Sequence, residues 1–100
     1  MCLCGMLAAE FQTLPSPMQR AVVRFFDENE AWLERVLEEG QRNGTLRLST
    51  TPREEARAII SGLEGAMLVA RSYGDVARFG AAARRLVGSL AAVPPERVAR

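Results

Sequence analysis

The chain has 100 residues, a length that suits one domain built around a single hydrophobic core. Its 13 basic and 12 acidic residues leave a net charge of +1, which argues against a domain that grips DNA through bulk charge, because that mode needs a basic stripe. Histidine is absent, which removes the commonest general base and the commonest metal ligand, so we expect neither a metal site nor a cofactor.

The N-terminal region predicts no membrane segment and no secretion signal. Its apolar run is short and no basic residue precedes it, so we expect a cytoplasmic protein without membrane contact. Cys2 and Cys4 point in different directions on a helix and are predicted to be small buried side chains in a reducing compartment. A redox or thiol-sensing role is the less favoured alternative.

The first helical pattern runs from Cys2 to about Gln12 and ends at Pro15 and Pro17. No capping residue precedes it, since Met1 lies at its start or inside it. We therefore expect that the original protein began upstream of this methionine.

The second helix is predicted to begin with Ser16 as N-cap and Pro17 at the first helical position, and to end near Asn43 before Gly44. Its apolar residues recur at three- and four-residue steps and form one broad face. Asn29 is the polar exception on that face and needs a partner. A backbone carbonyl, a water molecule and an effector are the alternatives.

Residues 45–50 form a short connector with a weak strand-like alternation, and a capping box follows, with Thr51 as N-cap, Pro52 next and Glu54 three residues after the cap. The third helix should run to about Tyr73, with Gly74 as its stop. It is apolar nearly all round, apart from a narrow polar stripe at Arg57, Ser61, Glu64 and Arg71. Such a helix must be covered on nearly all sides, so we expect a second subunit to supply part of the cover.

The fourth helix is predicted to begin at Asp75 as its cap and to end near Val93, before Pro94 and Pro95. Its apolar residues alternate three- and four-residue steps and have small residues beside them, which suits packing within one bundle and also a two-fold dimer face. We favour the dimer face. One helical domain over residues 1–93 and a short polar tail over residues 94–100 complete the prediction.

Five segments of the sequence, taken together in their order and spacing, resemble a known protein family. They are CLCGMLAAE at residues 2–10, Phe26-Asp27, Trp32-Leu33, Glu39-Gly40-Gln41 with Gly44 and Leu46, and LEGAMLVAR at residues 63–71. Together they resemble the C-terminal half of TetR-family transcriptional repressors, over roughly residues 2 to 92. The family's segment Gly-Cys-x-x-Gly-x-Leu-Ala-x-Glu has Met1 here in place of its first glycine, and its LEGALLLAR helix is similar to residues 63–71 of this chain.

The resemblance implies an all-α bundle of about four helices, an effector-binding and dimerisation domain whose two C-terminal helices form a dimeric four-helix interface. Family members carry an N-terminal helix-turn-helix that reads DNA, and these residues contain none, so we expect no nucleic-acid contact from this chain. A fragment, an internal start codon and a natural stand-alone domain are the possible explanations.

The resemblance also implies an effector cavity between the first, second and third helices. A small apolar or aromatic molecule is expected there, because the predicted inner faces carry no clustered charge. The candidate lining residues are Cys4, Leu7, Phe11, Phe25, Phe26, Asn29, Trp32, Leu33, Met67 and Arg71. For any single one of them ordinary core packing is the favoured explanation. The candidates for the homodimer interface are Ala58, Gly62, Ala66, Val69, Tyr73, Phe79, Ala83, Leu86 and Leu90.

The leading hypothesis is therefore a ligand-sensing, dimer-forming domain of a TetR-family repressor. The alternative is a ligand-free helical module that pairs with itself or with a full-length regulator. An enzyme is the least favoured class, because acidic residues such as Glu34 and Glu38 cluster on a solvated helix face rather than converge on a cleft.

Overall fold

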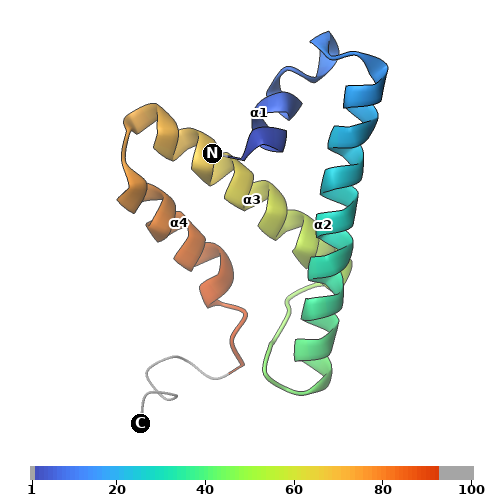
Figure 1. Ribbon diagram of the computed structural model, residues 1–100. Coiled ribbons are helices and arrows are strands. Elements are labelled where there is room, and N and C mark those ends of the chain that lie inside the picture. Colours follow the sequence, from blue (N-terminus) through green and yellow to red (C-terminus); the bar gives the residue numbers. More distant parts are fainter. Residues whose placement is uncertain (1, 93–100) are drawn as a thin grey trace.

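The computed structural model describes residues 2–92, which form four α-helices and one turn of 3-10 helix (Figure 1). Their bounds are α1 Leu3–Ala9, η1 Phe11–Thr13, α2 Ser16–Arg42, α3 Pro52–Tyr73 and α4 Val76–Gly88. The predicted all-helical fold and the order of its helices are confirmed. The predicted tail at residues 94–100, together with Val93, lies outside the described residues.

The local signals that begin and end α3 act as the sequence predicts. The Thr51 hydroxyl oxygen accepts a hydrogen bond from the Glu54 amide at 3.2 Å. The reciprocal half of the capping box is not made, because the Glu54 carboxylate accepts a bond from the Thr50 hydroxyl instead. Gly74 ends the helix with a left-handed backbone (φ 60°), and Asp75 then caps α4 by accepting a bond from the Ala77 amide at 3.0 Å.

Two helix boundaries predicted near prolines are wrong. Pro15, not Ser16, holds the N-cap position of α2, because its carbonyl already accepts bonds from the amides of Met18 and Gln19 at 2.9 and 3.0 Å. The first helix ends at Ala9 rather than near Gln12, and the chain tightens into η1 before the prolines.

The end of α4 also differs from the prediction, since the helix stops at Gly88. The chain beyond it pairs with the connector between α2 and α3: the Arg47 amide donates to the Leu90 carbonyl at 2.7 Å, and the Ala92 amide donates to Thr45 at 3.2 Å. A bridge between Leu46 and Ala91 results. The weak strand-like alternation of residues 45–50 therefore has a structural counterpart.

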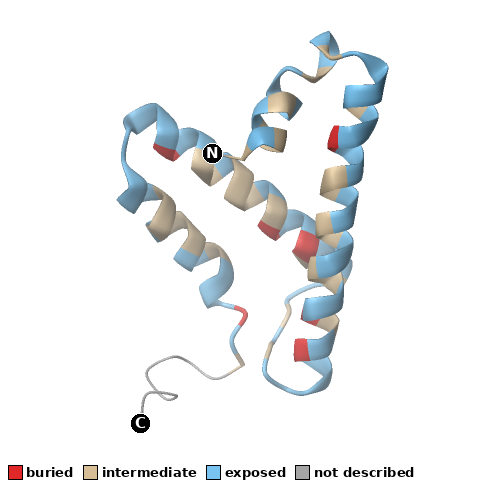
Figure 2. Ribbon diagram, viewed as in Figure 1, coloured by how far each residue is buried: buried red, intermediate tan, exposed pale blue. Residues whose placement is uncertain are grey.

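The core lies where α2 crosses α3. The segment that follows α4 packs against both helices there. Leu37, Ala56, Ile59 and Leu90 form its buried cluster, with Leu33, Leu46, Leu48 and Leu63 packed against it. Figure 2 shows the other residues of this thin molecule mostly half-buried or exposed. Extents of 51 × 31 × 17 Å leave few side chains enclosed on all sides.

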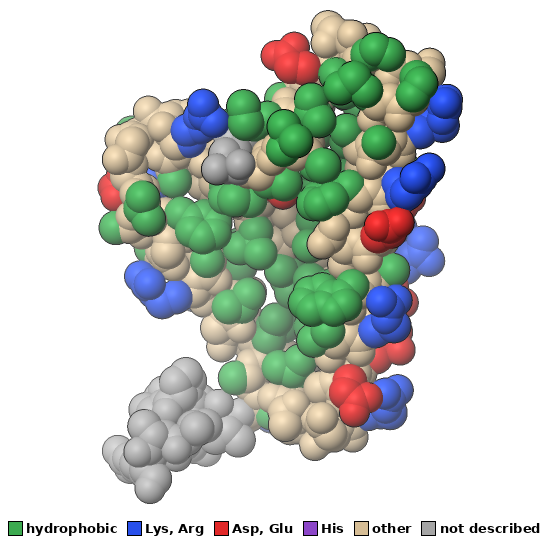
Figure 3. Space-filling model, viewed as in Figure 1, with side chains coloured by type: hydrophobic (Ala, Val, Ile, Leu, Met, Phe, Trp, Pro, Cys, Tyr) green, Lys and Arg blue, Asp and Glu red, His purple; other side chains and the backbone are tan. Residues whose placement is uncertain are grey.

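Helix α1 lies in the angle between α2 and α3, while α4 packs along the other side of α3 (Figure 1). In Figure 3, hydrophobic side chains cover the area between α4 and α2, and charged side chains line the outer edge of α2. Leu68 and Val69 of α3 are about half exposed, so this chain alone leaves part of α3's apolar surface uncovered. Within residues 2–92, no helix is long and apolar enough to cross a membrane.

Candidate ligand-binding site

A cleft of about 430 Å³ lies between α1, α2 and α3, where the sequence predicts an effector cavity. We call it the three-helix cleft. Its lining residues are Gly5, Ala8 and Ala9 of α1, Phe26 and Glu30 of α2, and Ile60, Ser61, Glu64, Gly65 and Leu68 of α3. The volume falls in the range of small-molecule sites, and most of its walls are apolar.

Helical spacing explains how α1 and α2 shape the cleft. Gly5, Ala8 and Ala9 stand three and four residues apart, so they share one face of α1 and leave room because their side chains are small. On α2, the Phe26 ring is held by an edge-to-face contact with Phe25, with centroids 5.4 Å apart and planes at 81°.

Two carboxylates from different helices also line this cleft. The Glu64 Oε2 atom is buried and has no hydrogen-bond partner among the described residues. It lies against α1, since a Cβ added at Gly5 would stand 2.2 Å from it. The second carboxylate, Glu30, lies 3.6 Å from Arg57 Nε. Glu30 therefore has a cationic partner in Arg57. The buried oxygen of Glu64 has no hydrogen-bond partner among the described residues.

The sequence interpretation missed both acids as parts of a binding site. Ser61 and Glu64 belong to the polar stripe of an otherwise apolar helix; Glu64 lies against Gly5 of α1, whereas the other three residues of the stripe are exposed. The polar stripe on this apolar helix was the feature of the sequence from which Ser61 and Glu64 could have been predicted as lining residues. The expectation that the inner faces carry no clustered charge is wrong for this cleft, because charge from α2 and α3 meets there.

The structure spreads the ten predicted lining residues over several places. Phe26 lines the three-helix cleft, Phe11 lines a groove on α2, and Met67 and Arg71 line a third cleft between α3 and α4. The other six line none of these three sites: Cys4, Leu7, Phe25, Asn29, Trp32 and Leu33.

Several of these six have structural explanations. Asn29 donates its side-chain amide to the Phe25 carbonyl at 2.8 Å, so a backbone carbonyl is the partner that its position requires. Leu33 packs against the core cluster. Trp32 is 56% exposed.

The cysteines provide little support for a reactive thiolate. Both are free and half-buried. Desolvation raises the pKa of the Cys4 thiol, and the nearby Cys2 and Glu64 raise it further because negative charge disfavours a thiolate. The Cys4 thiol therefore stays protonated near neutral pH, which opposes the chemistry that a thiol sensor uses.

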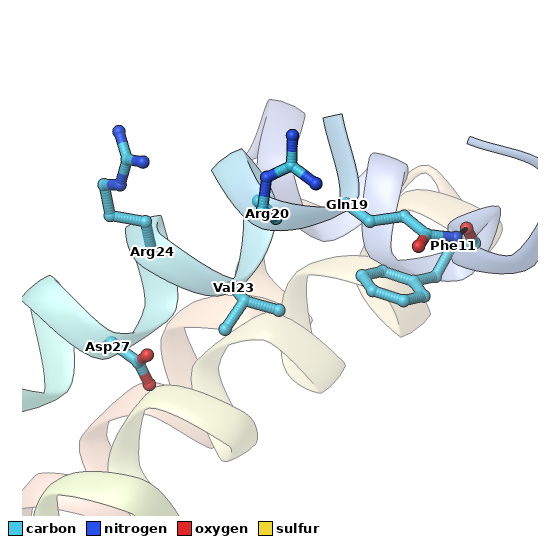
Figure 4. Close-up of a pocket in the computed structure, with 6 residues that line it drawn as sticks. All are labelled: Phe11, Gln19, Arg20, Val23, Arg24 and Asp27. Carbon is cyan, nitrogen blue, oxygen red and sulfur yellow. Dashed lines mark hydrogen bonds between the residues drawn. The ribbon is translucent and has the colours of Figure 1, made fainter. Parts of the chain in front are cut away.

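The groove on α2 is shallow and partly basic (Figure 4). Arg20 and Arg24 stand one turn apart, and their side chains extend to the same side of the helix. Gln19 ties this part of α2 to η1 by donating a hydrogen bond to the Phe11 carbonyl at 2.9 Å.

Of the nine predicted dimer residues, three are exposed, five are half-buried and one is buried. Gly62, Ala66, Val69 and Leu86 line a shallow groove between the two helices. Tyr73 is exposed, and the Arg78 guanidinium lies 3.8 Å from its ring centroid. Ala58 is also exposed, whereas Phe79 and Ala83 are half-buried on α4.

Leu90 requires a correction as an interface residue. It is buried in the core of its own chain, against Leu37, Ala56 and Ile59, so its side chain is not available to a partner. Leu86 also has a role inside the chain, because a Cβ at Gly62 would stand only 2.8 Å from its Cδ2 atom.

Comparison with known proteins agrees with this architecture. A transcriptional regulator of the TetR family from Agrobacterium tumefaciens is 37% identical with a TM-score of 0.88, over 91% of this chain and 48% of that one. The reduced form of NemR from E. coli is 27% identical with a TM-score of 0.83, over 90% of this chain and 48% of that one. This chain thus spans about half the length of each, and no curated protein sequence matches it significantly. A sequence model of the tetracyclin repressor-like C-terminal domain matches residues 1–86, so the chain belongs to that family.

Proposed function

We propose that this chain is the effector-sensing and dimerisation part of a TetR-family transcriptional regulator, and that a small apolar molecule binds in the three-helix cleft. The observation that carries the proposal is the cleft itself, with about 430 Å³ of space and largely apolar walls, in a domain of this family. Such a volume is typical of small-molecule sites.

The position of α3 suggests how a bound ligand would act. Ile60, Glu64 and Leu68 line the three-helix cleft, whereas Ala66 and Val69 line the groove between α3 and α4, and Gly65 lines both. One helix therefore carries both surfaces. A ligand that favours one position of α3 would shift the population of dimer arrangements, and in the intact regulator the spacing of its DNA-reading heads.

Thermal unfolding with a panel of hydrophobic dyes and drug-like compounds tests the ligand. A compound at 100 times its Kd stabilises a protein by about 2.7 kcal/mol. Ala8→Phe fills the cleft and should abolish the stabilisation. Ala31→Phe makes the same change at an exposed α2 position outside the cleft and should preserve it. Equal stabilisation of both variants would contradict the site, and no stabilisation by any compound would leave the ligand-free module.

We also propose a homodimer through the exposed residues of the groove between α3 and α4. Val69 in this groove is 47% exposed, and Val23 on the outer side of α2 is 47% exposed as well, which gives a matched pair. Val69→Glu should give a monomer at micromolar concentration by sedimentation velocity, while Val23→Glu should remain dimeric. A monomeric wild-type chain, or dimers of both variants, would refute the interface.

A further inference from the structure

We propose that the three-helix cleft selects apolar molecules that carry a positive charge, such as arylalkyl ammonium ions. The inference rests on the proposed function, in which this cleft binds a small apolar ligand. It adds a positive charge to that ligand, whereas the sequence predicts inner faces without clustered charge.

The Glu64 carboxylate is the first reason. Its Oε2 atom is buried against Gly5 and has no hydrogen-bond partner among the described residues, although the side chain lines the cleft. Removing a charged oxygen from water without a partner is unfavourable, and an opposite charge nearby offsets that loss. A cation in the cleft would lie near this carboxylate and offset the cost of its partly buried charge.

The second reason is the charge balance of the lining. Glu30 places another carboxylate on the opposite, α2 side of the cleft, and neither arginine nor lysine is among the lining residues. Arg57 forms an ion pair with Glu30, with Nε and Oε1 3.6 Å apart, whereas the buried Oε2 atom of Glu64 has no hydrogen-bond partner among the described residues. With Glu30 paired to Arg57, the carboxylate of Glu64 leaves the lining of the cleft with a negative charge that attracts cations.

The remaining lining residues are apolar or small, and they indicate that the rest of the ligand is apolar. Phe26, Ile60 and Leu68 offer apolar surface, and Ala8 and Ala9 leave space beside them. A hydrophilic cation would gain nothing from these walls, and a neutral apolar molecule would leave Glu64 without a partner. A molecule with both an ammonium group and an apolar body satisfies both parts of the lining.

Three ligands with one carbon skeleton test the charge directly: 4-phenylbutylammonium, 4-phenyl-1-butanol and 4-phenylbutyrate. Isothermal titration near neutral pH, with the whole chain, measures each affinity. Because hydrogen bonds to charged groups are the strong ones, we expect the ammonium to bind about tenfold more tightly than the alcohol, with the carboxylate weakest.

Matched variants assign the effect to the cleft. Glu64→Gln keeps the shape of the side chain and should lower the affinity for the ammonium to that for the alcohol, without changing the alcohol's own affinity. Glu28→Gln removes one negative charge from an exposed position of α2 outside the cleft and should change none of the three affinities. If circular dichroism shows that Glu64→Gln does not fold, Glu30→Gln serves in its place, with a smaller loss in the same direction.

The outcomes separate the two proposals. Equal binding of the alcohol and the ammonium, or tightest binding of the carboxylate, overturns the selection of cations and leaves the cleft as a ligand site. A loss of ammonium affinity as large in Glu28→Gln as in Glu64→Gln also overturns it, because the preference would then come from overall charge. If none of the three binds, the cation proposal fails, and the wider compound panel decides whether the cleft binds any ligand.

Discussion

Replacement of Gly40 by alanine should destabilise the fold, although alanine favours helices. Gly40 is buried in the last turns of α2, and its carbonyl accepts hydrogen bonds from the amides of Thr45 and Leu46 at 2.9 and 3.0 Å. These bonds fold the connector back onto the helix. A Cβ at Gly40 would stand 2.3 Å from Cδ1, 2.5 Å from Cγ and 3.1 Å from Cβ of Leu46.

The size of the effect follows from two opposing contributions. Extra atoms in a packed region cost about 1–3 kcal/mol. A rotation of the Leu46 side chain cannot relieve the contact fully, because its Cβ is tied to a backbone whose amide is hydrogen-bonded. Helix propensity returns about 1 kcal/mol for Gly to Ala. We expect a net loss of up to about 2 kcal/mol, and each kcal/mol lowers Tm by about 4–8 °C in a domain of this size.

Urea denaturation followed by circular dichroism measures the change, with Gly65→Ala as the control. Gly65 lies in the middle of α3, and a Cβ there would meet no atom within 4 Å, so this variant should gain up to about 1 kcal/mol from propensity alone. The two variants should move in opposite directions. A Gly40→Ala protein as stable as Gly65→Ala would refute the argument that contact with Leu46 determines the residue at position 40.

Three further predictions test other local features. Thr51→Ala should cost about 1 kcal/mol in urea denaturation, because the Glu54 amide loses its cap, and an unchanged midpoint would contradict that role. Gly62→Ala should destabilise less than Gly40→Ala, since the contacted Leu86 methyl groups lie at the end of a flexible side chain, and the same denaturation experiment ranks the two. The raised pKa of Cys4 means that the folded thiol holds its proton where the unfolded thiol loses it, so stability should fall as pH rises through the ordinary thiol pKa of about 8.5. Urea midpoints at neutral and alkaline pH should show a smaller decline in Cys4→Ser than in wild type, and equal declines would argue against the shift.

The helix boundaries show which parts of the fold can be predicted from local sequence. The start of α3 at Pro52 and its end before Gly74 follow from a capping threonine and a left-handed glycine, which act within a few residues. The end of α4 depends on a distant partner: Leu90 leaves the helix to join a core made by α2 and α3, and its carbonyl bonds to Arg47. No periodicity near Leu90 contains that information.

For the candidate site too, some features follow from the sequence and others depend on tertiary packing. The sequence alone determined a helical domain of this size, near-neutral and without histidine, with an α3 too apolar for one chain to cover, and the family resemblance added a position for the cavity between the first three helices. Only the tertiary structure decided which residues line it, because Gly5, Glu30 and Glu64 come from three helices and meet through packing. Local propensity determines where a helix forms, whereas burial of a carboxylate depends on neighbours distant in the chain. That dependence is why the fold brought charge into a cavity expected to be uncharged.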